Sequence, residues 1–283
     1  MIEKVGVIGA GQMGGGIAHV FAQHGYEVVL HDVAEAQLSR AKRLIGENLE
    51  RQAKKGAVDA GAIPGILARI TPAQDLAALG GCALAVEAVT EREPLKLEIF
   101  RRLDAALPKG AILASNTSSI PITRLAAATG RPERVIGMHF MNPVPVMGLV
   151  EVIRGLATSD ATFDEVAGLV KALGKELAVS QDYPGFIVNR ILIPMINEAA
   201  FVVYEGIASP GDVDKGMKLG TNQPMGPLAL ADLIGLDTVL AIMRVLHDGF
   251  ADPKYRPCPL LVKLVDAGRL GRKSGHGFHS YAK

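Results

Sequence analysis

The sequence has few cysteines and no long apolar or charged runs, and each absence excludes a class of protein. Its 283 residues include only Cys82 and Cys258, so no disulfide framework is available and a reducing compartment is expected. No uninterrupted apolar run reaches about 18 residues, the length of a membrane span. The formal net charge is +1, and no block of like charges favours a nucleic-acid partner. Because the chain opens on an apolar strand pattern without a basic leader, we expect a cytoplasmic protein with no membrane partner.

The order of the secondary-structure patterns predicts two domains. At 283 residues the chain is long for a single domain. Up to Ser180, short β-branched runs alternate with amphipathic segments, which is typical of an α/β domain with a doubly wound parallel sheet. From Asp182 onward, helical patterns follow one another without strands. We therefore predict an α/β domain over residues 1–183 and an all-α domain over residues 184–283.

A glycine-rich turn follows the first predicted strand. The run Lys4–Ile8 leads into Gly9, Gly11, Gln12, Met13 and Gly14, which match the pattern G-x-G-x-x-G, and a helical pattern comes next. Glycines at these positions allow a tight turn and let backbone N–H groups approach a pyrophosphate at the helix N-terminus. Strand, turn and helix together predict a Rossmann-type dinucleotide site.

Asp32 stands at the end of the second predicted strand, eighteen residues after Gly14, where a ribose-binding acid is expected. Its alternative role is that of an N-cap for the helix that begins near Ala34. Val33 and Ala34 follow without an arginine, and a carboxylate repels a 2′-phosphate. The pattern therefore favours NAD over NADP.

The stretch from Arg134 to Glu151 contains the strongest candidate for acid–base chemistry. An apolar strand ends near His139, a loop with two prolines follows, and Glu151 stands alone in a second apolar run. A carboxylate beside a histidine fixes the tautomer of the ring and stabilises its charged form. The alternative is a half-buried histidine in a turn and a solvent-facing glutamate on an edge strand.

Further polar residues follow other predicted strands. Ala88, Val89 and Glu91 come after the strand Ala83–Val86, and a cluster of serine, asparagine and threonine follows Ala111–Ala114. These groups either line a site at the carboxyl end of the sheet or cap the next helices. The helical segment Ala34–Lys55 ends in basic residues, which form either a solvated face or a holder for an anionic substrate tail.

In the second half, Pro184–Glu205 predicts a helix that is apolar nearly all round, with Pro194 inside it. Such a helix is buried by its own domain, by a partner subunit, or by both, so a homodimer through this domain is expected. Further helices are predicted over Ser209–Leu219, Gly226–His247 and Pro259–Asp266. No metal site is expected.

Several blocks together resemble one enzyme family from end to end. They are GAGQMGGGIA, SNTSSI, GMHFMNPVPVMGLVEV, DYPGFIVNRILIP, MKLG and QPMGPLALADLIGLD. They are similar to the L-3-hydroxyacyl-CoA dehydrogenases, in particular the short bacterial 3-hydroxybutyryl-CoA dehydrogenase type. The second, third and fourth blocks are specific, whereas a glycine fingerprint alone leaves many dehydrogenases open. One departure is His279, which follows Phe278 where family members often have an aromatic residue.

This resemblance implies a role for each candidate. His139 would be the acid–base residue and Glu151 its orienting partner, while Ser118 and Asn189 would bind the reacting oxygen of an acyl-CoA substrate. Coenzyme A would meet Asn48, Lys54 or Lys55. The NAD cleft would be lined by Gly9, Gly11, Gln12, Met13, Gly14, Asp32, Ala88, Val89, Glu91, Lys96, Asn116, Asn142 and Lys273. The alternatives are a dehydrogenase of the same fold acting on another hydroxy acid, such as a sugar acid, and a catalytically silent NAD-binding protein.

Overall fold

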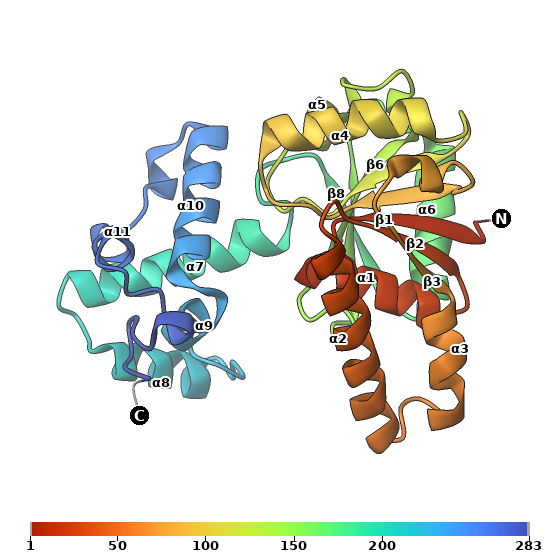
Figure 1. The fold of residues 1–283 in the computed structure, drawn as a ribbon. Helices are drawn as coiled ribbons and strands as arrows, with labels where there is room; N and C mark the ends of the chain where they lie inside the picture. The colour runs from red at the N-terminus through yellow and green to blue at the C-terminus, as the bar shows by residue number, and fades with distance from the viewer. Residues whose placement is uncertain (1, 282–283) are drawn as a thin grey trace. The chain divides into compact units, whose positions relative to one another are not determined.

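The computed structural model describes residues 2–281 and contains two compact units, which divide between Tyr183 and Pro184. The first unit is built on an eight-stranded sheet in the order β3-β2-β1-β4-β5-β6-β7-β8 (Figure 1). The strands are β1 (Lys4–Ile8), β2 (Glu27–His31), β3 (Ile70–Ala73), β4 (Leu84–Glu87), β5 (Ile112–Ser115), β6 (Val135–Phe140), β7 (Leu149–Arg154) and β8 (Glu176–Gln181). Chain order runs outward from β1 in both directions, so the predicted doubly wound, Rossmann-type class is confirmed.

The sequence predicted a parallel sheet, but one pair of neighbouring strands is antiparallel. Strands β6 and β7 pair antiparallel, whereas the other neighbouring strands pair parallel. The connection between them, residues 141–148, contains no helix. A parallel connection needs a crossover of a dozen or more residues, so this short loop returns the chain in the opposite direction.

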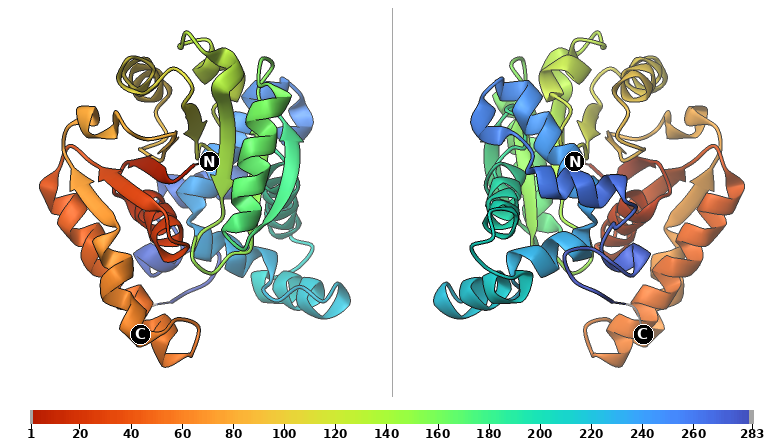
Figure 2. Two further views of the ribbon diagram at one scale, coloured as in Figure 1. Left: turned by 90° about the vertical axis from the view of Figure 1, so that its right-hand side faces the viewer. Right: turned by 90° about the vertical axis from the view of Figure 1, so that its left-hand side faces the viewer.

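Helices cover both faces of the sheet. Residues of α1 (Gln12–Gln23), α2 (Glu35–Lys54) and α6 (Asp160–Ala172) share one apolar core with alternate residues of the strands. Figure 2 shows α6, in green, beside the last strands of the sheet, in agreement with its contacts to β6, β7 and β8. On the other side lie α4 (Glu93–Ala106) and α5 (Ile122–Ala126) (Figure 1).

Because side chains alternate along a strand, the residues between the core positions point to the α4 and α5 face. In β4 and β5, Val86 and Ala114 belong to the core shared with α1, so Glu87 and Ser115 lie on the opposite face. The same alternation in β6 and β7 puts His139 and Glu151 on that face. The polar residues of the candidate site therefore gather on one side of the sheet.

Strand β3 was not predicted from the sequence. It contains Pro72, which pairs with Leu30 at the edge of the sheet, where a missing N–H is tolerated. The chain reaches β3 through α3 (Ile63–Ala68), whose first turn contains Pro64. Single-turn 3₁₀ helices complete the unit, at η1 (Ala60–Ala62), η2 (Leu76–Leu79) and η3 (Pro132–Arg134).

The second unit is helical. It consists of α7 (Val188–Tyr204), α8 (Pro210–Gly220), α9 (Pro227–Ile234), α10 (Leu236–Phe250), η4 (Pro253–Tyr255), α11 (Pro259–Asp266) and η5 (Arg272–Ser274). The predicted single helix over Gly226–His247 is wrong, because Gly235, with φ at +103°, separates α9 from α10. The core of this unit includes Ile196, Leu240 and Leu261. No helix within residues 2–281 is long and apolar enough to cross a membrane.

Candidate active site

The glycine turn between β1 and α1 has the geometry of a phosphate-binding turn. Gly9 adopts φ of +99°, and a Cβ atom on Gly14 would stand 1.7 Å from the carbonyl oxygen of Gly9. Nothing lies within 4 Å of the position that a Cβ on Gly11 would take. Helix α1 begins without a side-chain cap, so backbone N–H groups of its first turn face this open space.

Asp32 follows β2 and holds the turn from the other side. Its Oδ2 accepts a hydrogen bond of 2.8 Å from the N–H of Ala10, and its Oδ1 accepts one of 3.0 Å from the N–H of Ala34. It is not the N-cap of α2, since that position belongs to Ala34. The carboxylate keeps lone pairs for two further donors, such as ribose hydroxyls.

A cleft of about 550 Å³ opens beside this carboxylate, and we call it the Asp32 cleft. Its lining includes Gly9, Gly11, Gln12, Met13, Asp32, Val33, Ala88, Val89, Leu95 and Ile99. A dinucleotide requires an open turn for its phosphates, an acid for its ribose and apolar walls for its adenine, and this cleft offers all three. The residues therefore fit NAD.

His139 and Glu151 are direct partners across β6 and β7. The His139 Nδ1 atom lies 2.6 Å from Glu151 Oε2. Glu151 is fully buried and the His139 side chain is only 10% exposed, so the pair is shielded from water. A carboxylate at Nδ1 fixes the tautomer that leaves Nε2 to exchange a proton with a ligand. The pairing arises from the antiparallel register rather than from the loop that joins the two strands.

The loop after β5 is tied to its neighbours. Asn116 Oδ1 accepts a 2.9 Å hydrogen bond from the N–H of Phe140, which joins this loop to the end of β6. The N–H of Ser118 donates to Glu91 Oε1 at 3.0 Å. These two contacts bring the loop that contains Ser118 to the same end of the sheet as His139.

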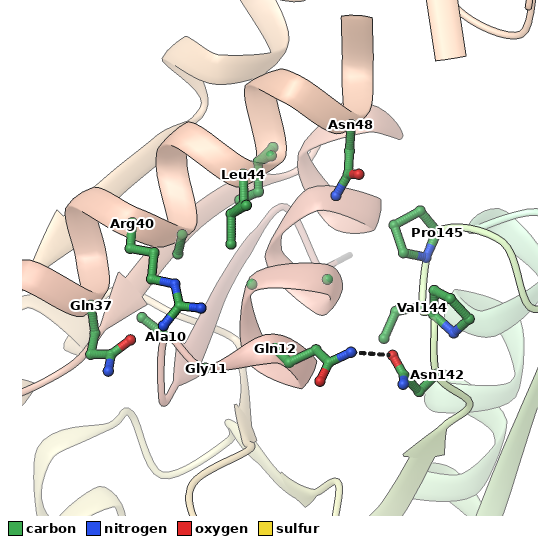
Figure 3. Close-up of a pocket in the computed structure, with 15 residues that line it drawn as sticks. Ala10, Gly11, Gln12, Gln37, Arg40, Leu44, Asn48, Asn142, Val144 and Pro145 are labelled. Atoms are coloured by element: carbon green, nitrogen blue, oxygen red, sulfur yellow. Dashed lines mark hydrogen bonds between the residues drawn. The ribbon is translucent and has the colours of Figure 1, made fainter. Parts of the chain in front are cut away.

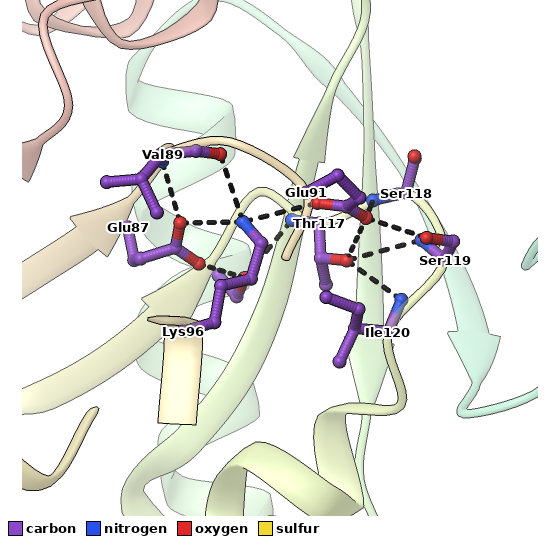
Figure 4. Close-up of polar contacts among 9 residues, drawn as sticks. Glu87, Val89, Glu91, Lys96, Thr117, Ser118, Ser119 and Ile120 are labelled. Atoms are coloured by element: carbon purple, nitrogen blue, oxygen red, sulfur yellow. Dashed lines mark hydrogen bonds and ion pairs between the residues drawn. The ribbon is translucent and has the colours of Figure 1, made fainter. Parts of the chain in front are cut away.

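Glu91 also accepts hydrogen bonds from the hydroxyls of Thr117 and Ser119, at 2.5 and 2.8 Å (Figure 4). Burial by itself would raise the pKa of Glu91, but the charge of Lys96 and these hydroxyls outweigh it and lower the pKa. Lys96 is only 1% exposed and pairs with Glu87 at 2.6 Å. Lys96, predicted from the sequence as a cofactor contact, is thus held beneath the loops of the cleft.

A second cleft, of about 570 Å³, lies between α1, α2 and the loop 142–145, and we call it the α2 cleft (Figure 3). Asn48 and Asn142 both line it. Asn142 Oδ1 accepts a 3.0 Å hydrogen bond from Gln12 Nε2, which joins the loop to the glycine turn. Gln12 also lines the Asp32 cleft, so the two clefts meet at this side chain.

Two features of this region were missed by sequence reasoning. Arg40 lines the α2 cleft and points toward the glycine turn in Figure 3. Lys175 is buried and its Nζ donates to the carbonyl oxygens of Val144 and Met147, at 2.8 and 2.6 Å. Burial lowers the pKa of Lys175. Lys175 follows Gly174 just before β8, and nothing in this local sequence indicated that it would hold the loop 142–147.

The remaining candidates belong to the C-terminal end of α2 or to the second unit. Lys54 and Lys55 are exposed at the C-terminal end of α2 and are not among the described residues that line the α2 cleft. In the second unit, Asn189 lies in the first turn of α7. Lys273, in η5, pairs with Asp237 of α10 at 2.6 Å. His279 donates its backbone N–H to Asp232, and its ring contacts Asp214 at 2.7 Å.

A doubly wound sheet with a glycine turn, an acid beside that turn and a buried histidine–carboxylate pair is the arrangement of a nicotinamide-dependent dehydrogenase. The sequence matches two family profiles, "3-hydroxyacyl-CoA dehydrogenase, NAD binding domain" over residues 4–183 and "3-hydroxyacyl-CoA dehydrogenase, C-terminal domain" over residues 185–281. The chain therefore belongs to the 3-hydroxyacyl-CoA dehydrogenase family, and its cofactor is NAD.

Individual relatives agree with this assignment. A 3-hydroxybutyryl-CoA dehydrogenase of Bradyrhizobium diazoefficiens is 58% identical over 281 residues, which cover 99% of this chain and 96% of the relative. The crystal structure of (S)-3-hydroxybutyryl-CoA dehydrogenase from Ralstonia eutropha is 50% identical, with a TM-score of 0.98 and full coverage of both chains. A diketoreductase, described as acting on dicarbonyl compounds, is 32% identical with a TM-score of 0.87, and 99% of each chain is covered.

Proposed function

We propose that this protein interconverts (S)-3-hydroxybutyryl-CoA and acetoacetyl-CoA with NAD as the hydride carrier. The observation that supports this proposal most strongly is the buried His139–Glu151 pair, at the same end of the sheet as the loop that contains Ser118. The names of the relatives supply the substrate class, since several are 3-hydroxybutyryl-CoA dehydrogenases.

In the oxidation direction, NAD held at the Asp32 cleft would supply the acceptor for the hydride from C3 of the substrate. His139 Nε2 takes the proton of the 3-hydroxyl, and the C3–O bond becomes a carbonyl. The carboxylate of Glu151, 2.6 Å from Nδ1, orients the ring and stabilises the charge that it gains. In the reverse direction the imidazolium returns the proton to the oxygen.

We propose that Ser118 and Asn189 donate hydrogen bonds to the reacting oxygen and position it at His139. Glu91 accepts a hydrogen bond from the N–H of Ser118, so the backbone from which this side chain projects is held before the substrate arrives. Asn189 stands in the first turn of α7, and its amide is one of the few polar groups at that end of a strongly apolar helix.

The α2 cleft is the proposed site of the coenzyme A arm. It is separate from the Asp32 cleft but meets it at Gln12. Asn48 lines the cleft, and Lys54 and Lys55 continue along α2 beyond it. These two exposed ammonium groups are the proposed partners of the phosphates of coenzyme A.

The test of this function is the consumption of NADH with two ketones that share the same reacting carbonyl. We expect acetoacetyl-CoA to be reduced with a kcat/KM at least a hundredfold higher than that for free acetoacetate, because only the thioester contains the coenzyme A arm. Equal efficiency with the two ketones would contradict the acyl-CoA assignment.

A second candidate, the reduction of a dicarbonyl compound without coenzyme A, is favoured by the similarity to the diketoreductase. Acetylacetone distinguishes it, since this diketone has no phosphate and no carboxylate. A kcat/KM for acetylacetone above that for acetoacetyl-CoA would favour the second candidate. A kcat/KM for a polyhydroxy acid above that for the acyl-CoA substrate would indicate a sugar acid as the substrate.

We also propose a homodimer formed through the second unit. Ile191 and Tyr204 of α7 are 66% and 50% exposed, and Ile207, just beyond the helix, is 68% exposed. Large apolar side chains at this exposure on one element support the proposal of a protein–protein contact there. A second copy of the chain is the proposed occupant.

A further inference from the structure

Arg190, in the first turn of α7, contacts two aromatic rings of the second unit. Its guanidinium carbon lies 3.7 Å from the centroid of the Phe250 ring and 4.6 Å from the centroid of the Tyr255 ring. The two rings also contact each other, with their centroids 5.3 Å apart. Phe250 is the last residue of α10 and Tyr255 is the last residue of η4, so this side chain joins the start of α7 to the chain around the end of α10.

Stability alone would not favour an arginine at this position. The first turn of α7 contains no acidic residue, and the N-terminal end of a helix dipole repels a cation. Arg190 Nη1 is buried, and it has no hydrogen-bond partner among residues 2–281. Attraction between a cation and an aromatic ring offsets part of these costs. A methionine, however, packs on aromatic rings without burying a charged group. What an arginine adds is a rigid planar group with a defined direction.

The backbone that leads into this turn is closely packed against α10. The N–H of Arg190 donates to the carbonyl oxygen of Gly185 at 3.1 Å. Gly185 has φ of +77°, and a Cβ atom there would lie 2.7 Å from Cδ2 of Leu246. A Cβ on Gly249 would lie 2.6 Å from Cγ of Pro184. The chain that enters α7 therefore has a fixed path, and the Arg190 side chain is a second, separate attachment of the same turn.

Two attachments on one helical turn fix how that turn is rotated about the helix axis. Successive residues of an α-helix project about 100° apart, so a fixed direction for Arg190 also fixes the direction of Asn189. The amide of Asn189 is the proposed donor to the reacting oxygen. Such a donor contributes fully to the rate only when it is held close to its productive geometry.

We propose that Arg190 is a positioning residue, which orients the Asn189 amide through its contact with Phe250 and Tyr255 and touches neither substrate nor cofactor. This inference rests on the proposed role of Asn189. It assigns a role to a residue that sequence reasoning did not single out. The first turn of α7 is then oriented before the substrate arrives, so less entropy is lost when the reacting oxygen is aligned.

The test uses Arg190→Met, which retains an apolar contact with the two rings but removes the planar cation. We expect kcat and kcat/KM for acetoacetyl-CoA to fall together, by at least about tenfold, because the lost orientation acts on the transition state. The Tm should not fall, since a buried nitrogen without a partner is removed. The Kd for NADH should be unchanged, because the residues that line the Asp32 cleft all belong to the first unit.

Arg190→Lys is the second variant. It keeps a cation beside the rings but not the planar group, so its kcat should lie between those of Arg190→Met and the wild type. The control is Arg256→Met, because the Arg256 guanidinium carbon lies 5.0 Å from the ring centroid of Phe201, in the last turn of the same helix. This control loses a contact of the same kind at the other end of α7, and it should retain the kcat of the wild type.

Asn189→Ala separates the failure of this inference from the failure of the proposed function. A wild-type kcat in Asn189→Ala would show that the proposed role of Asn189 is wrong, and the inference would fall with it. If Asn189→Ala lowers kcat, then Asn189→Ala/Arg190→Met should be no slower than the slower of the two single variants, since Arg190 acts through Asn189.

Losses that multiply in this double variant would overturn the positioning role and leave the proposed function intact. A wild-type kcat in Arg190→Met, together with a lowered kcat in Asn189→Ala, would do the same. The contact of Arg190 with the two rings would then be structural only.

Discussion

Asp32 offers a prediction whose magnitude can be worked out from its contacts. Its two oxygens accept from the N–H groups of Ala10 and Ala34, at 2.8 and 3.0 Å, so the carboxylate is fixed at the end of β2 before any ligand binds. A hydrogen bond to a charged group contributes about 1.5–3 kcal/mol. Each 1.4 kcal/mol corresponds to about a tenfold change in Kd. Asp32→Ala should therefore weaken NADH binding by about 10- to 100-fold.

The same carboxylate opposes NADPH. Two unit charges about 4 Å apart near a protein surface repel each other by about 4 kcal/mol, and the partial exposure of Asp32 reduces that figure. We expect a kcat/KM for NADH at least about tenfold above that for NADPH, a difference of about 1.4 kcal/mol. In Asp32→Ala the gap should narrow, chiefly because NADH binding is lost.

The assay is the steady-state reduction of acetoacetyl-CoA with each cofactor, together with the Kd for NADH from its own fluorescence. Asp59→Ala is the matched control, because Asp59 also accepts a backbone N–H two residues ahead, that of Gly61, and does not line the Asp32 cleft. Equal efficiencies with NADH and NADPH in the wild type would refute the reasoning, as would an unchanged Kd for NADH in Asp32→Ala.

Three further predictions concern substrate, assembly and pH. Lys54→Gln/Lys55→Gln should raise the KM for acetoacetyl-CoA but not for acetoacetyl-pantetheine, and Lys42→Gln on the same helix is the control. An equal rise in KM for both substrates would show that the lysines do not bind the phosphates of coenzyme A. Light scattering should show a monomer for Ile191→Asp and a dimer for Leu156→Asp, the control at a residue of the first unit that is 91% exposed. A monomeric wild type at micromolar concentration would contradict the proposed homodimer. The pKa of Glu91 is below its ordinary 4.5, so its contribution to stability is present above that pH and is lost on acidification through the lowered pKa. The Tm difference between wild type and Glu91→Gln should therefore shrink below pH 4.5. A Tm difference that stays constant with pH would contradict this prediction.

Local patterns in the sequence were sufficient to predict the glycine turn and the place of Asp32 beside it. The turn from Gly9 to Gly14 and the acid at Asp32 follow from glycine geometry and from the reach of a carboxylate, both of which are properties of short segments. The partnership of His139 and Glu151 was predicted, but its cause was not. The two residues meet because β6 and β7 are antiparallel with His139 opposite Glu151, and the sequence had predicted a parallel sheet.

The features that were missed depend on distant contacts. Pro72 argued against a strand, and only its position at the sheet edge allows β3 to form. Apolar residues recur at helical spacing on both sides of Gly235, so the sequence pattern did not reveal the break between α9 and α10. The break is made by the positive φ of that residue. Lys96 was expected to line the NAD cleft, and its burial depends on Glu87 and Glu91, which come from outside its helix.

The central claim is that His139 and Glu151 act as one acid–base unit during hydride transfer. The most direct measurement is a kinetic double-mutant cycle with His139→Gln, Glu151→Gln and the double variant, in both reaction directions. We expect His139→Gln to lower kcat by about 10²–10⁴, the usual span for a positioned acid–base group. Glu151→Gln should lower kcat with little change in the Kd for NADH, and its acid limb for oxidation should move to lower pH, because an imidazolium without a facing negative charge loses its proton more readily.

The double variant should lose far less activity than the product of the two single losses, since the carboxylate acts only through the ring that it contacts at 2.6 Å. That result, with the shifted acid limb in Glu151→Gln, is what the account predicts. Independent, multiplicative losses with an unshifted pH profile would contradict it and would make Glu151 a buried strand carboxylate with no part in the chemistry.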